Sequence, residues 1–155
     1  MIDSVPTIRQ ATPADVAAWA QLRLGLWPDA DDPQEELAES LADAEGAVFL
    51  ACLAGGEAVG FAEVRLRHDY VNGTESSPVG FLEGWYVQPH WQGHAVGRAL
   101  LAAVQAWTRA AGCSELASDS RVEDVQAHAA HRACGFEETE RVVYFRMVLD
   151  AELLQ

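Results

Sequence analysis

The segment from Phe81 to Leu101 has the clearest chemical meaning in the sequence. An apolar strand is predicted to end near Pro89, and a helix to begin after a short loop that contains Gly93 and Gly97. The first N–H groups of a helix lack partners within it and carry the positive end of its dipole, so they bind anions such as a pyrophosphate. Small residues allow close approach there, and Arg98 adds positive charge. Taken alone, such glycine spacing is also common at strand–helix junctions that bind nothing.

Glu83 is a second residue whose position suggests chemistry. It stands in the middle of the predicted strand from Val79 to Val87, among apolar residues and shortly before the loop. A carboxylate that faces a pocket can act as a general base. It can equally be an outward-facing strand residue in contact with water. The residue pattern by itself leaves both interpretations open.

The charge of the chain narrows the classes of partner. The net charge is −14 with histidines counted as neutral, and the chain has no lysine, so every positive charge is an arginine. Such a polyanion disfavours nucleic acid and anionic membranes as partners. No Lys, Arg or His occurs from Leu24 to Val64, a stretch rich in acids: Asp29, Asp31, Asp32, Glu35, Glu36, Glu39, Asp43 and Glu45. A field of one sign attracts cationic ligands, although acidity also serves solubility alone.

Local signals predict an alternation of helices and strands. Thr12-Pro13-Ala14-Asp15 is typical of a helix start, with a threonine cap and a proline in the first turn. The expected helices are Thr12 to Leu26, a second one starting at Asp32-Pro33, Gly97 to Ala111, and Asp124 to Cys134. The expected strands are Ala47 to Leu53, Ala58 to Leu66, Val79 to Val87, Ser114 to Ser118, and one or more within Phe136 to Leu149. This order predicts one α/β domain with a mixed sheet over residues 1–155.

Other features are consistent with a cytoplasmic protein that holds no metal. The N-terminus from Met1 to Arg9 lacks a signal-peptide pattern, and no apolar run reaches the roughly 18 residues of a membrane span. Three widely spaced cysteines indicate reduced thiols. The histidine pairs His90 with His94 and His128 with His131 lack a third ligand, so we expect no metal site.

A resemblance to a known family gives these features a more specific meaning. The run Gln92-Gly93-His94-Ala95-Val96-Gly97 resembles the acetyl-CoA motif of the GNAT superfamily, with Ala95 at the usual central glycine. Further blocks resemble the dimeric aminoglycoside 6′-N-acetyltransferase branch. They are Leu26-Trp27-Pro28, Arg67 to Gly73, Ser76 to Val79, Phe81 to Gly84, Ala117-Ser118-Asp119 and Gly135 to Arg141. The similarity spans roughly Ile8 to Arg146.

The resemblance implies a fold, an activity and a set of site residues. It implies a GNAT fold with a central twisted mixed sheet flanked by helices, and a homodimer that acetylates an aminoglycoside amine with acetyl-CoA. Glu83 would be the base. The substrate site would comprise Trp27, Tyr70, Glu83, Asp119 and Glu140, with Tyr70 reaching into the partner's site. The cofactor positions would be Trp85, Tyr86, Val87, Gly93, His94, Ala95, Val96, Gly97, Arg98 and Asp124. At Asp124 the branch normally has an asparagine.

Two other functions stay open from the sequence. The same chemistry could act on another amine, such as a polyamine or a peptide N-terminus. A non-catalytic acyl-CoA-binding module is the other alternative, and it would be favoured by loss of Glu83 or of the phosphate loop. Both features are present.

Overall fold

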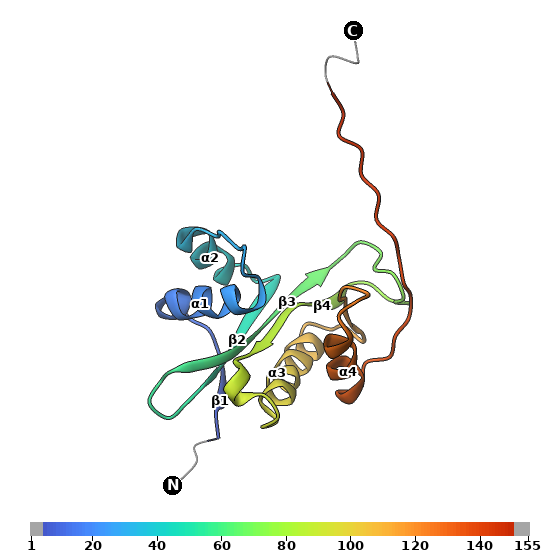
Figure 1. Cartoon of the computed structure of the whole chain (residues 1–155). Coiled ribbons are helices and arrows are strands. Elements are labelled where there is room, and N and C mark those ends of the chain that lie inside the picture. Colours follow the sequence, from blue (N-terminus) through green and yellow to red (C-terminus); the bar gives the residue numbers. More distant parts are fainter. Residues whose placement is uncertain (1–4, 151–155) are drawn as a thin grey trace.

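A computed structural model describes residues 5–150 (Figure 1). Residues 1–4, part of the segment that argued against a signal peptide, and residues 151–155 lie outside the described part. The helices are α1 (Val16–Leu26), α2 (Gln34–Leu41), α3 (Val96–Ala110) and α4 (Val125–Ala133), with 3-10 turns η1 (Pro13–Asp15) and η2 (Pro89–Trp91). The strands are β1 (Thr7–Gln10), β2 (Gly46–Cys52), β3 (Ala58–Arg67), β4 (Val79–Val87) and β5 (Leu116–Ser118).

The five strands form one mixed sheet in the order β1-β2-β3-β4-β5. The first three pairings are antiparallel, and β4 pairs with β5 in parallel. Helices α1 and α2 cover one face of this sheet, while α3 and α4 lie on the other side (Figure 1). The mixed sheet with flanking helices confirms the predicted fold class.

Each face of the sheet has its own apolar cluster. On the α3 face, Leu100 and Val104 pack against Ala62 and Leu82. On the α1 face, Trp19 and Leu22 pack against Leu50 and Phe61. The alternation of side chains along β2 and β3 supplies both clusters, because successive strand residues point to opposite faces.

Most predicted elements are confirmed, with ends displaced by a few residues. The Val79–Val87 strand has the predicted bounds. In α4 the helix begins one residue later than expected, because Asp124 is its N-cap. Strand β1 was not predicted: Ile8 is the single apolar residue in Thr7–Gln10, and the strand forms by pairing with β2.

The prediction of a strand within Phe136 to Leu149 is wrong for the single chain. No helix or strand follows α4 among the described residues. The C-terminal segment instead runs away from the domain as an extended trace (Figure 1). The apolar residues Val143, Phe145, Met147 and Leu149 are at least 76% exposed on it. A strand needs a neighbour to pair with its backbone hydrogen-bonding groups, and residues 5–150 provide no partner strand for this segment.

Candidate active site

The predicted phosphate loop follows the end of β4 and is hydrogen-bonded to it. The Trp85 indole N–H donates to the carbonyl oxygen of Gly97 at 2.9 Å. The side-chain amide of Gln92 donates to the carbonyl oxygen of Val87, also at 2.9 Å. Ala95 caps α3 in the left-handed region, with φ 63°. These contacts hold the start of α3 beside the end of β4, so its unpaired N–H groups are available to an anion.

Strands β4 and β5 separate just before this loop. Their pairing covers only Gly80 to Leu82, although β4 continues to Val87. Beyond Leu82, β5 provides no partner for that edge of β4. The predicted pantetheine-binding residues Trp85, Tyr86 and Val87 lie on this open stretch. An extended ligand with amide groups, such as the arm of coenzyme A, suits an open strand edge because it can supply the missing hydrogen bonds.

Two predicted cofactor residues have protein partners. The guanidinium of Arg98 donates to the carbonyl oxygen of Ala133 at 2.8 Å, at the end of α4. The carboxylate of Asp124 accepts from the backbone N–H of Ala127 at 3.0 Å, at the start of α4. Arg98 therefore links α3 to the end of α4, whereas Asp124 caps the start of α4. The loop residues Gly93, His94 and Ala95 are exposed, whereas Val96 is buried.

Glu83 faces the α1 side of the sheet and stands at a β-bulge in β4. Residue Glu63 of β3 pairs with Gly84 and Val64 pairs with Leu82, so Glu83 is an extra residue in β4. Such a bulge breaks the alternation of side chains. Leu82 consequently packs in the α3-side core, while Gly84 contacts Trp27 and Phe61 on the α1 side. Glu83 shares that side, where it lines a cavity.

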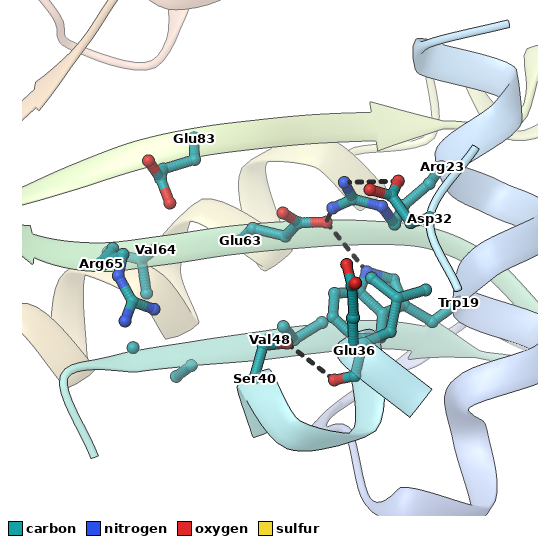
Figure 2. Close-up of a pocket in the computed structure, with 13 residues that line it drawn as sticks. Trp19, Arg23, Asp32, Glu36, Ser40, Val48, Glu63, Val64, Arg65 and Glu83 are labelled. Atoms are coloured by element: carbon teal, nitrogen blue, oxygen red, sulfur yellow. Dashed lines mark hydrogen bonds and ion pairs between the residues drawn. The ribbon is translucent and has the colours of Figure 1, made fainter. Parts of the chain in front are cut away.

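This cavity lies between the sheet and helices α1 and α2 and has a volume of about 240 Å³ (Figure 2). Its lining contains four carboxylates: Asp32, Glu36, Glu63 and Glu83. Three of these, all except Glu83, were not predicted as site residues. Glu63 has the same sequence signal as Glu83, an acid inside an apolar strand, and could have been identified by it.

Glu63 is the most enclosed of these acids. Its carboxylate forms an ion pair with Arg23 and accepts a hydrogen bond from the Trp19 indole at 3.0 Å. Burial raises the pKa of the Glu63 carboxyl, and the hydrogen bond and charge of Arg23 oppose that rise. Glu63 and Glu83 thus bring two carboxylates from neighbouring strands to one cavity, which favours a cationic occupant.

Glu83 has an arginine partner at the rim of the cavity. The guanidinium of Arg67 donates to its carboxylate at 2.8 Å and lies 4.0 Å from the centre of the Phe81 ring. Several acids of the stretch from Leu24 to Val64 have partners as well: Asp32 pairs with Arg23, Asp43 with Arg65, and Glu45 with His68. No ion pair within residues 5–150 involves Glu36. The acidic stretch from Leu24 to Val64 therefore lines part of the cavity. The arginines that flank this stretch, Arg23 and Arg65, neutralise several of its carboxylates.

The other predicted substrate residues do not line the cavity of the single chain. Trp27 lies beside it, against Arg23 and Gly84. Tyr70 is 74% exposed in the loop between β3 and β4. Asp119 directly follows β5, and Glu140 belongs to the exposed C-terminal segment. Gly73 in the β3–β4 loop closely approaches Thr139, so the segments with Tyr70 and Glu140 adjoin each other.

A histidine occupies the gap where β4 and β5 diverge. The His131 ring contacts the Ser118 hydroxyl at 2.8 Å and the carbonyl oxygen of Ala127 at 2.6 Å. It also meets the Trp85 indole edge to face.

Residues 5–150 hold no cluster of three or more metal-ligating side chains. Within the same residues, no helix is both long and apolar enough to cross a membrane.

Comparisons with known proteins agree with this architecture. The model of the acetyltransferase (GNAT) family matches residues 14–136. An aminoglycoside N(6′)-acetyltransferase type 1 of Stenotrophomonas maltophilia is 89% identical over 150 residues, which are 97% of this chain and 98% of that protein. The protein of the same name from Salmonella enteritidis is 44% identical, covering 90% of this chain and 97% of its own.

Solved structures give the same result. The crystal structure of the 6′-N-acetyltransferase AAC(6′)-Ih from Acinetobacter baumannii matches with a TM-score of 0.88 and 36% identity, covering 94% of this chain and 99% of that one. AAC(6′)-Iy, solved with the bisubstrate analogue CoA-S-monomethyl-acetylneamine, matches with a TM-score of 0.88 and 44% identity, covering 94% and 100%. The chain therefore belongs to the GNAT acetyltransferase family, within the group of its aminoglycoside N(6′)-acetyltransferase type 1 relatives.

Proposed function

We propose that this protein transfers the acetyl group of acetyl-CoA to the 6′-amine of aminoglycoside antibiotics and thereby confers resistance. One observation carries the proposal: Glu83, at the bulge in β4, lines an acidic cavity and directly follows the last residue that pairs with β5. A cationic acceptor and an extended thioester donor can thus meet at one strand from opposite sides. The near full-length relatives with the same activity in their names support this assignment.

Glu83 would serve as the general base. The substrate amine is protonated near neutral pH and must lose a proton before its nitrogen can attack the thioester carbonyl carbon. The carboxylate of Glu83 takes that proton, directly or through a water. Bound acetyl-CoA would supply the acetyl group: the new C–N bond replaces the C–S bond, and coenzyme A leaves as its thiolate. A backbone N–H near Val87, at the open end of β4, would stabilise the negative charge that develops on the carbonyl oxygen.

The phosphate end of acetyl-CoA would bind at the start of α3. The loop from Gly93 to Arg98 supplies N–H groups and the positive helix end, and it is held in place by Trp85 and Gln92. His94, Ala95 and Val96 would contribute backbone groups, and Asp124 would cap the start of α4. The start of α3 lies beside the end of β4, along whose open edge the pantetheine arm would run.

A homodimer would complete the aminoglycoside site. Tyr70, Asp119 and Glu140 are not among the residues that line the cavity of one chain. We propose that Trp27, Glu83, Asp119 and Glu140 come from one subunit and Tyr70 from its partner. The C-terminal segment supports the dimer, because it exposes Val143, Phe145, Met147 and Leu149. These alternate residues would form one apolar face along an extended segment, and a second copy would cover it.

A cytoplasmic location stays a prediction from the sequence.

Steady-state kinetics test the base and the substrate together. Purified protein with acetyl-CoA should release free thiol fastest with aminoglycosides, and much less with polyamines or peptide amines. Glu83→Gln should lower kcat/KM by roughly 10²–10⁴, the usual contribution of general acid–base catalysis. Its affinity for acetyl-CoA, measured by calorimetry, should not change.

Glu36→Gln provides the matched control, because Glu36 lines the same cavity and has no assigned chemistry. Its kcat/KM should stay within a few-fold of the parent value. Faster turnover of polyamines or peptides would favour the alternative acceptor. Binding of acetyl-CoA without any turnover would favour the non-catalytic module.

A further inference from the structure

Arg23, in the last turn of α1, joins the acidic cavity to an aromatic residue beside it. Its guanidinium pairs with Glu63 and with Asp32, the latter at 3.1 Å (Figure 2). The same group lies 4.8 Å from the ring centre of Trp27 and 5.6 Å from that of Trp19. One planar side chain therefore contacts two carboxylates and two indoles, from α1, β3 and the connection to α2.

The pair of Arg23 and Glu63 is well enclosed. Their side chains are 16% and 14% exposed, and the Trp19 indole donates a second hydrogen bond to the Glu63 carboxylate. Charges buried to this degree are held in place, because separating them would leave each without a partner. The guanidinium is thus fixed with respect to the sheet.

Trp27 is held between this guanidinium and the sheet. Trp27 is the C-cap of α1, and its backbone N–H donates to the carbonyl oxygen of Arg23 at 2.7 Å. The edge of its ring lies over Gly84, where a Cβ atom would come within 2.7 Å of the indole. Gly84 pairs with Glu63 across the strands and follows Glu83 in sequence. The ion pair and the indole therefore occupy neighbouring positions next to the proposed base.

We infer that Arg23, fixed by Glu63, is a positioning residue that orients the Trp27 ring for the aminoglycoside. The inference rests on the proposed function, in which Trp27 contacts the substrate. Arg23 itself would touch no reacting atom. Its planar fork can stack on an aromatic ring while it pairs with carboxylates, a combination that the ammonium group of lysine cannot reproduce.

A charge-neutral double variant isolates this role. Arg23→Met/Glu63→Gln removes one positive and one negative charge, so the net attraction of the cavity for a polycation is retained. We expect the KM for neamine to rise about tenfold, because the variant loses one aromatic–cation contact and the fixed orientation of the Trp27 ring that this contact provides. The kcat should stay within about threefold, and the KM for acetyl-CoA should not change. Calorimetric titration with neamine gives the same comparison without turnover.

The matched control removes an exposed ion pair away from the cavity. Arg121→Gln/Glu123→Gln is also charge-neutral, and neither residue lines the cavity. Its KM for neamine should change less than about twofold, within the usual range for exposed ion pairs. Arg23→Lys serves as a second test should the double variant fail to fold, since it keeps the charge and loses the planar stacking. It should also raise the KM for neamine.

Combination with Trp27→Ala shows whether the pair acts through the ring. Trp27→Ala alone should raise the KM for neamine, and adding Arg23→Met/Glu63→Gln should raise it little further. Fully additive effects, or an unchanged KM in a folded pair variant, would overturn the inference while leaving the proposed function intact. An unchanged KM in Trp27→Ala would overturn both the inference and the assignment of Trp27 to the substrate site. Absence of any neamine turnover by the parent protein would overturn the proposed function itself.

Discussion

At the scale of single residues, Ala95 is the most unusual position in the cofactor loop. It is the one non-glycine residue within 5–150 that has a positive φ, and it caps α3 in the left-handed region. A side chain there costs about 1–2 kcal/mol relative to glycine. The GNAT motif usually has glycine at this place, and the left-handed angle explains that preference physically.

Ala95→Gly should therefore stabilise the protein. Relief of the left-handed strain is partly offset by the larger freedom of glycine in the unfolded chain, about 0.4–1 kcal/mol. We expect a net gain of about 0.5 kcal/mol in the free energy of unfolding, measured by urea denaturation, and an affinity for acetyl-CoA at least equal to the parent's. Ala102→Gly, at an exposed position within α3, should instead lose about 1 kcal/mol. Loss of stability in both variants would contradict the strain argument.

At the scale of elements, Asp15 joins the first strand to the first helix. Its carboxylate accepts from the backbone N–H of Thr12 at 2.7 Å and pairs with Arg9 of β1, also at 2.7 Å. The hydrogen bond from Arg9 is the main reason that the pKa of the Asp15 carboxyl lies far below its usual range. β1 has little apolar content of its own, so this contact helps to fix its place.

Asp15→Ala should destabilise the fold by about 1 kcal/mol at pH 7, the usual cost of losing a cap. A lowered folded-state pKa stabilises the fold above the unfolded pKa of about 3.9, and this contribution is lost as the pH falls. The difference between parent and variant should consequently shrink between pH 5 and pH 3, as measured by urea denaturation. Asp31→Ala, which removes an exposed acid, should cost less than about 0.5 kcal/mol. A difference that grows on acidification would refute this account.

At the scale of the whole molecule, the exposed C-terminal segment is the part on which the proposed homodimer rests. Phe145 is 92% exposed, and its neighbours on the same side of the segment are apolar. Light scattering should give the parent protein twice the chain mass of 16.8 kDa. Phe145→Asp should give a monomer, because a charge cannot be buried in the apolar contact without a partner. The monomer should keep acetyl-CoA binding and lose aminoglycoside turnover.

Arg146→Gln is the control, since Arg146 adjoins Phe145 and should point to the opposite side. That variant should remain a dimer with near-normal turnover. Mixing the inactive variants Tyr70→Ala and Asp119→Ala should restore part of the activity if each pocket combines both subunits, because a mixed dimer retains one intact site. A monomeric parent protein, or no recovery despite verified subunit exchange, would argue against the shared pocket.

Local sequence signals alone determined several elements of this protein. Thr12-Pro13 marks the start of the first helical segment, the apolar run Val79–Val87 forms β4 with the predicted bounds, and the periodic apolar residues of α3 define that helix. These features depend on side chains within a few positions of one another, and so their spacing suffices. The resemblance added the activity, which the family comparisons support.

Only the tertiary structure decided how these elements form a site. The bulge at Glu83 depends on the register between β3 and β4, and the meeting of Arg23 with Glu63 joins residues forty positions apart. β1 forms because β2 offers it an edge, whereas the apolar C-terminal segment pairs with no strand among the described residues. Strand pairing and burial are set by distant neighbours, and a local pattern cannot specify which neighbour will be present.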